Sequence, residues 1–158
     1  MSPHFSKTHI VLAVLGSVVA ISALAYFATN TGAIMLLGSF GASALLLFAL
    51  PEAPLSQPRA VLLGHLSASA IALLCLWLCG PHWWAVGLAT GLGVGFMMLA
   101  RCVHPPAGSN AIIVFLAKPG AWLLLSSTLA GVAALIAIAC VYHRATGRCR
   151  YPLHWRRA

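Results

Sequence analysis

The chain has 158 residues, of which 61% are hydrophobic and only 6% are charged. A soluble domain carries about 25% charged residues, so this composition excludes a soluble globular fold and indicates an integral membrane protein. The formal net charge is +8, and Glu52 is the only acidic residue. Because a single carboxylate leaves little acid–base machinery, we do not expect an enzyme.

Apolar runs follow one another along the whole chain. A membrane-spanning helix needs about 20 predominantly apolar residues. The candidate segments are residues 8–28, 32–50, 60–80, 83–102, 106–117 and 121–143. The run 106–117 is too short to span as a plain helix, and 32–50 is interrupted by Gly38-Ser39-Phe40-Gly41. We therefore predict an all-α membrane protein with five to six transmembrane segments.

The two irregular segments resemble each other. Residues 41–48 align without gaps to residues 108–115, with matching glycine, alanine and phenylalanine, and a proline follows each run. Each copy lies between two long apolar runs. This pattern predicts two inverted three-segment repeats, about 8–80 and 83–143, each with a broken or half helix, as in many secondary transporters.

The basic residues favour six crossings with both ends inside. Arg59, Arg101 and the arginines of the tail 144–158 would then lie at the cytoplasmic face, while Lys118 would lie outside. We read the tail as a topology signal, although anionic-lipid or nucleic-acid binding is an alternative use of such charge. A second topology stays open, with four crossings and residues 32–50 and 103–117 as re-entrant loops.

The stretch Arg101–Asn110 places polar groups and two prolines inside an apolar sequence. Proline suits the first turn of a helix, so a half-helix should begin near Pro106. Its free amides would attract an anion, and the matching end in the first repeat would face it. The predicted anion-binding residues are Ser39, Gly41, Ala42, Ser43, His104, Gly108, Ser109 and Asn110.

His104 is the titratable member of this predicted site. When protonated it would attract an anion, and when neutral it would release it. The alternative is a structural donor to a carbonyl that the prolines free. Arg59, His65 and Arg101 are predicted to act in gating or a vestibule, although Arg101 also suits an interfacial anchor. No ligand spacing predicts a metal site, and no cofactor is expected.

The sequence resembles the HPP family of integral membrane proteins. The family pattern H-P-P-A-G reads from His104 through Gly108, and further family-like features are Gly38–Ser43, Pro54–Arg59 and Gly64-His65. The resemblance implies an HPP-type transmembrane domain over residues 1–143. It also implies membrane transport, because plant and cyanobacterial relatives are associated with nitrite.

The expected function is therefore transmembrane transport of a small inorganic anion, with nitrite as the first candidate. The alternative is a non-transporting membrane scaffold or regulatory subunit. Besides the anion and the bilayer we expect a homo-oligomer, with Gly87, Gly91 and Gly95 as a candidate packing stripe, and no nucleic acid. We expect a bacterial inner membrane, with a cytoplasmic C-terminus.

Overall fold

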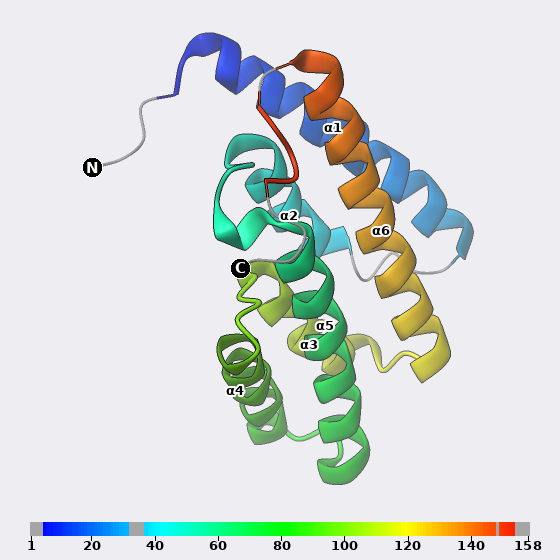
Figure 1. Cartoon of the computed structure of the whole chain (residues 1–158). Coiled ribbons are helices and arrows are strands. Elements are labelled where there is room, and N and C mark those ends of the chain that lie inside the picture. The colour runs from blue at the N-terminus through cyan, green and yellow to red at the C-terminus, as the bar shows by residue number, and fades with distance from the viewer. Residues whose placement is uncertain (1–4, 32–36, 148, 154–158) are drawn as a thin grey trace.

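A computed structural model gives the structure of residues 5–31, 37–147 and 149–153. These residues are helical and contain no strand, as the composition predicts. The α-helices are α1 Lys7–Thr31, α2 Leu37–Ala49, α3 Pro58–Cys79, α4 Trp83–Leu99, α5 Ser109–Ala117 and α6 Ala121–Thr146 (Figure 1). Two 3-10 turns, η2 Pro54–Ser56 and η3 Pro105–Gly108, precede α3 and α5. Residues 32–36 and the tail arginines Arg148, Arg156 and Arg157 lie outside the described residues.

The helices of the bundle differ in whether they are long enough to cross a membrane. Three helices are long and apolar enough to cross a membrane: Lys7–Asn30, Pro58–Cys79 and Ala121–Thr146. The others are shorter, with 13 residues in α2, 17 in α4 and 9 in α5. A helix of 13 residues reaches about 20 Å, which is less than the hydrocarbon thickness of about 30 Å.

Proline and backbone conformation set several helix boundaries. Pro58 lies in the first turn of α3 and Pro105 begins η3, where a missing N–H costs no intrahelical bond. Gly80 ends α3 with φ 73°, a conformation that glycine adopts without steric cost. Arg101, just after α4, has φ 51° and lies in the left-handed region that is rare for residues with a side chain.

The two predicted breaks have different outcomes. The chain is non-helical between α4 and η3, as predicted for the second break. The interruption predicted at Gly38–Gly41 is wrong, because α2 runs continuously from Leu37 to Ala49. Glycine costs a helix about 1 kcal/mol relative to alanine, but in an apolar environment every unpaired backbone group costs more. The helix therefore continues through both glycines.

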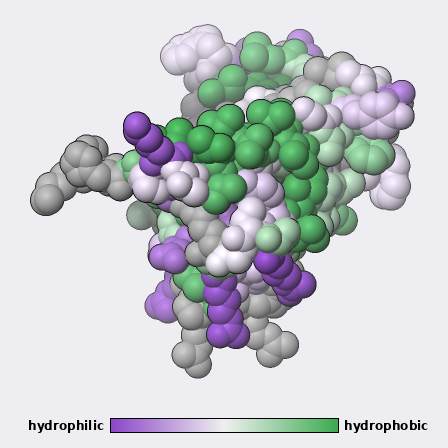
Figure 2. Space-filling view, turned by 90° about the horizontal axis from the view of Figure 1, so that it is seen from above, coloured by the Kyte–Doolittle hydropathy of each residue, from purple (hydrophilic) through white to green (hydrophobic). Residues whose placement is uncertain are grey.

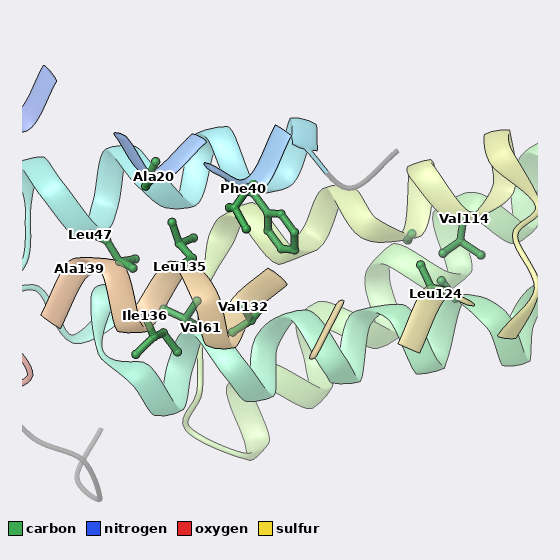
Figure 3. Close-up of a cluster of buried hydrophobic side chains, with 14 of the residues drawn as sticks. Ala20, Phe40, Leu47, Val61, Val114, Leu124, Val132, Leu135, Ile136 and Ala139 are labelled. Carbon is green, nitrogen blue, oxygen red and sulfur yellow. The ribbon is translucent and has the colours of Figure 1, made fainter. Parts of the chain in front are cut away.

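The hydrophobic core lies where α2, α3 and α6 meet (Figure 3). Phe40 and Leu47 of α2 are buried there with Val61 of α3 and Leu135 of α6. Phe40 lies so close to Gly131 that a Cβ on this glycine would collide with its ring. Close approach of α2 and α6 therefore depends on a missing side chain.

Several connections gather at one end of the bundle. The Tyr151 hydroxyl donates to Ser56 O over 2.8 Å, and the Leu153 amide donates to Gln57 Oε1 over 3.0 Å. Arg59 Nη2 donates to Ala100 O over 3.0 Å, which joins the start of α3 to the end of α4. The loop before α3, the end of α4 and the segment after α6 therefore share one end.

The outer surface is largely apolar. Val11 and Val18 of α1 are more than half exposed, as are Leu92 and Leu99 of α4. Figure 2 shows hydrophobic residues gathered over the middle of one face, with hydrophilic ones around its edges. Such a surface suits contact with lipid acyl chains, because lipid does not penalise exposed apolar area.

Candidate functional site

Ser43 stands at the centre of a buried polar cluster, which consists of Ser43, His65, Ser69, His104, Asn110 and Thr128. The Ser43 hydroxyl oxygen lies 2.9 Å from His65 Nε2 and 2.8 Å from His104 Nε2. It also lies 3.0 Å from Ser39 O, one helical turn earlier. One hydroxyl of α2 thus connects an imidazole of α3 with the imidazole beside the helix break.

His104 is held on both ring nitrogens. Its Nδ1 lies 2.7 Å from Leu55 O, the carbonyl at the centre of η2. A Cβ on Gly64 would lie 2.9 Å from His104 Cβ, so α3 approaches the histidine closely only at a glycine. The helix break, the η2 turn and Gly64 together fix the position of this imidazole.

The cluster continues from His65 toward α5 and α6. Asn110 Nδ2 donates to Ser69 Oγ over 2.8 Å and to His65 O over 3.3 Å. Ser69 Oγ in turn lies 3.4 Å from Thr128 Oγ1. Five segments therefore contribute polar side chains to one continuous network: α2, α3, α5, α6 and the residue before η3.

All six side chains of the polar cluster have 0% exposure. Within the described residues, two buried atoms of the cluster have no hydrogen-bond partner, His65 Nδ1 and Asn110 Oδ1. Buried polar atoms without partners are rare and costly, so each calls for an explanation. Here they are one potential donor and one acceptor, and the Asn110 side chain also donates to the backbone carbonyl of His65.

The polar cluster lies between the middle of the bundle and one of its ends. His65 is seven residues after Pro58, the first residue of α3, which corresponds to a rise of about 10 Å. The whole helix of 22 residues is about 33 Å long. The start of α3, which carries Arg59, and the connection after α4, which carries Arg101, form this end of the bundle.

Some predicted site residues lie elsewhere. Gly41 and Ala42 are exposed on the outer side of α2, and their amides belong to the helix interior. The Ser109 amide donates to Pro106 O within the η3 turn, and its hydroxyl also contacts that carbonyl. Gly108 is half-buried beside it. These amides are therefore not gathered into one pair of facing helix ends.

Other predicted residues do meet. Ser43, His104 and Asn110 belong to the polar cluster, and buried Ser39 contributes its carbonyl. His65, predicted for a vestibule, lies at the heart of the same network. Arg101 is exposed, and Arg59 is half-buried where it lines a groove of about 190 Å³ with Pro58, Leu62, Leu63 and Ile136. No hydrogen bond joins either arginine to the polar cluster in the described part of the chain.

Sequence reasoning missed Ser69, Thr128 and the Leu55 carbonyl. Ser69 follows His65 by four residues, so both share one face of α3. Two polar residues on one face of an otherwise apolar helix were the available signal. Nothing local marks Thr128 or Leu55, because their roles depend on contacts between distant segments.

Titratable side chains do not form a metal centre in the ranges 5–31, 37–147 and 149–153. No group of three His, Cys, Asp or Glu side chains lies close enough there to hold a metal ion. His65 and His104 approach each other, with ring centroids 5.0 Å apart, but Ser43 lies between their Nε2 atoms. The arrangement suits hydrogen bonding and proton exchange.

Comparison with known proteins gives the family. The model for the HPP transmembrane region matches residues 2–152. A transmembrane protein of Dictyostelium discoideum is 32% identical over 129 residues, which are 77% of this chain and 45% of the relative. A second one from the same organism is 30% identical over 130 residues, or 77% of this chain and 42% of the relative.

The chain spans less than half the length of these curated relatives. No solved structure matches it. The relatives are described as transmembrane proteins, in agreement with the three long apolar helices of the bundle. With a match over nearly its whole length, the chain belongs to the HPP family of membrane proteins, and three of its described helices are long and apolar enough to cross the membrane.

Proposed function

We propose that the protein transports a small inorganic anion across the membrane, with nitrite as the first candidate. One observation carries the proposal: a serine hydroxyl lies between two imidazole Nε2 atoms in a fully buried site. Imidazoles and hydroxyls are donors that can bind an anion, and the charge of a protonated imidazole would strengthen that binding. The bilayer interior offers an anion few such groups.

The charge balance of the chain supports an anionic substrate. The formal net charge is +8, and the only carboxylate side chain, Glu52, is exposed in the turn before η2. A small anion would therefore meet no buried negative charge of Asp or Glu on its way. In this proposal the substrate leaves unchanged, so the protein acts as a carrier or channel and not as an enzyme.

The proposed transport unit keeps the finer features that the sequence suggests. These are two inverted three-segment repeats, 8–80 and 83–143, with both chain ends in the cytoplasm of a bacterium. A homo-oligomer is part of the proposal, since Gly87 and Gly91 face outward on α4 with open space at their Cβ positions. Small residues four apart allow transmembrane helices of two copies to approach closely.

A second candidate is a non-transporting membrane scaffold or regulatory subunit. The complete burial of the polar cluster favours it, because a static network can serve only to fix helix packing. In a transporter the same burial corresponds to a closed state that opens during the cycle. The two candidates differ in whether an anion ever reaches Ser43.

The test is flux through purified protein in proteoliposomes. Nitrite, nitrate, formate and bicarbonate are offered in turn, and uptake is compared with protein-free liposomes of the same lipid. We expect nitrite uptake that saturates with concentration. If none of the four anions moves and none binds, the transport proposal fails and the scaffold role gains support.

A further inference from the structure

The Ser43 hydroxyl has more partners than hydrogens. It lies within 3.0 Å of Ser39 O, His65 Nε2 and His104 Nε2. A hydroxyl donates one hydrogen bond and accepts up to two. At any moment Ser43 therefore donates to one of these three atoms, and a nitrogen that does not receive its hydrogen must itself donate.

His104 has a fixed tautomer. Leu55 O, 2.7 Å from His104 Nδ1, can only accept, so Nδ1 carries a hydrogen. In neutral His104 the Nε2 atom is then an acceptor and receives the Ser43 hydrogen. When His104 is protonated, Nε2 donates to Ser43 Oγ, and the serine hydrogen must turn elsewhere.

His65 has no such fixed tautomer. Its Nε2 faces Ser43, while its Nδ1 has no hydrogen-bond partner in the described ranges. Asn110 Oδ1 is the other buried atom without a partner, and the same side chain donates to His65 O. His65 can therefore accept the Ser43 hydrogen at Nε2, which places its own ring hydrogen on Nδ1.

We propose that His104, Ser43 and His65 form a proton relay in which the serine hydroxyl is the switch. The relay starts with protonated His104 donating from Nε2 to Ser43, and Ser43 donating to Nε2 of neutral His65. The O–H bond of Ser43 breaks toward His65 Nε2 while a new one forms with the proton of His104 Nε2. His104 ends neutral, Ser43 ends as a hydroxyl again, and His65 ends with both nitrogens protonated.

The relay moves one positive charge from the connection before η3 to α3, and no atom is lost. In terms of the proposed function, on which this part rests, a charge that moves along the relay would couple anion movement to proton movement. The network beyond His65, through Asn110, Ser69 and Thr128, can reorient to follow the charge.

Few charged groups face the relay. Arg59 lies near buried Cys102, two residues before His104, and Glu52 is exposed. The groups that the surrounding elements bring to the relay are otherwise uncharged: Ser39 and Phe40 of α2, Leu55 of η2, Met97 of α4, Asn110 of α5 and Thr128 of α6. Each imidazole is therefore the closest titratable neighbour of the other, with ring centroids 5.0 Å apart.

The test is solid-state NMR of the full chain in liposomes with ring-¹⁵N histidine, titrated with acid. His65 and His104 are assigned by subtraction, using His65→Gln and His104→Gln. In the unsubstituted protein at partial protonation we expect exchange cross-peaks that show the proton passing between the two rings. In Ser43→Ala this exchange should be lost, while Ser67→Ala, whose hydroxyl donates to Gly64 O in α3, should keep it.

Ser43→Cys, close in size and a weaker hydrogen-bonding group, should also slow the proton exchange between the rings, so the test does not depend on the folding of one variant. Absence of this exchange in the unsubstituted protein, or exchange that survives both substitutions, would overturn the relay. No anion is needed for this measurement. Proton exchange between the rings without any anion flux would leave the relay standing and refute the proposed function alone.

Discussion

At the scale of single residues, His104 joins three separate elements beside the helix break. It donates to Leu55 O in η2, contacts Ser43 in α2 and packs against Gly64 in α3. The two expectations from sequence, a titratable partner for an anion and a structural donor, therefore apply to the same ring. A variant of His104 distinguishes the two roles when folding and anion flux are measured in the same sample.

For His104→Ala we expect a folded protein with lower stability and flux. Removing the ring leaves the Leu55 carbonyl and the Ser43 hydroxyl short of a partner, which costs about 1–3 kcal/mol. Thermal unfolding and nitrite uptake measure both effects. His82→Ala is the control, because His82 is exposed before α4. Misfolding of His104→Ala would support a purely structural histidine, and unchanged flux in folded protein would contradict its role in transport.

Gly64 permits the close approach of α3 to His104. In Gly64→Ala the new Cβ would lie 2.9 Å from His104 Cβ, which is attached directly to the backbone and cannot swing away. We expect the helices to separate slightly, with a stability loss of about 1–3 kcal/mol. Gly38→Ala, at an exposed position with open space around its Cβ, should be tolerated. Equal thermal midpoints for the two variants would contradict this packing.

At the scale of elements, much of the helix pattern could be predicted from the sequence. Six apolar runs correspond to six helices, because length and hydrophobicity alone decide which segments are helical in lipid. The break at His104-Pro105-Pro106 was also predictable, since proline cannot continue α4. The break expected at Gly38–Gly41 is absent from α2. Glycine only weakens a helix, and the burial of Phe40 and Ser43 stabilises the helical conformation there.

The site was less predictable than the helices. His104, Ser43 and Asn110 were expected from the polar residues around the breaks. Their partners were not, because Leu55 and Thr128 are brought to them by packing between segments distant in sequence. The backbone amides expected at paired helix ends are not gathered at one point, and the buried polar groups that do meet are side chains of several helices.

The segment after α6 holds the η2 turn that positions His104. Tyr151 donates to Ser56 O, and burial raises the pKa of this phenol above its ordinary value. Tyr151→Phe should lower stability by about 1 kcal/mol, whereas Tyr26→Phe, at an exposed position, should not. Thermal unfolding in detergent measures this difference. If the two variants unfold at the same temperature, the segment does not stabilise the bundle.

The same phenol predicts a pH dependence. Its pKa is higher in the folded than in the unfolded state, so its contribution to stability is present below about pH 10, the unfolded value. The contribution is lost as the pH rises above that value, because only the unfolded chain then gains from ionisation. We expect the stability difference between the unsubstituted protein and Tyr151→Phe to shrink there, and a constant difference would contradict burial of the hydroxyl.

At the scale of the whole molecule, the charged connections gather at one end. Ser56 and Gln57 contact the segment after α6, so the loop before α3 lies with the C-terminal side of the bundle. A six-crossing arrangement places this loop inside, whereas a four-crossing arrangement places it outside. An epitope inserted after Glu52 should therefore be hidden from antibody in intact spheroplasts, and one after His82 should be accessible. The reverse pattern would favour four crossings.

The most direct measurement of the central claim compares two serine variants in one flux experiment. Ser43→Ala and Ser67→Ala remove the same atom from helices of one bundle, but only Ser43 joins the two imidazoles. With equal amounts of folded protein in proteoliposomes, we predict that Ser43→Ala lowers nitrite uptake by about tenfold, as expected when about 1.4 kcal/mol of binding is lost. Ser67→Ala should transport normally. Equal uptake by the two variants would contradict the claim that the anion passes through the polar cluster.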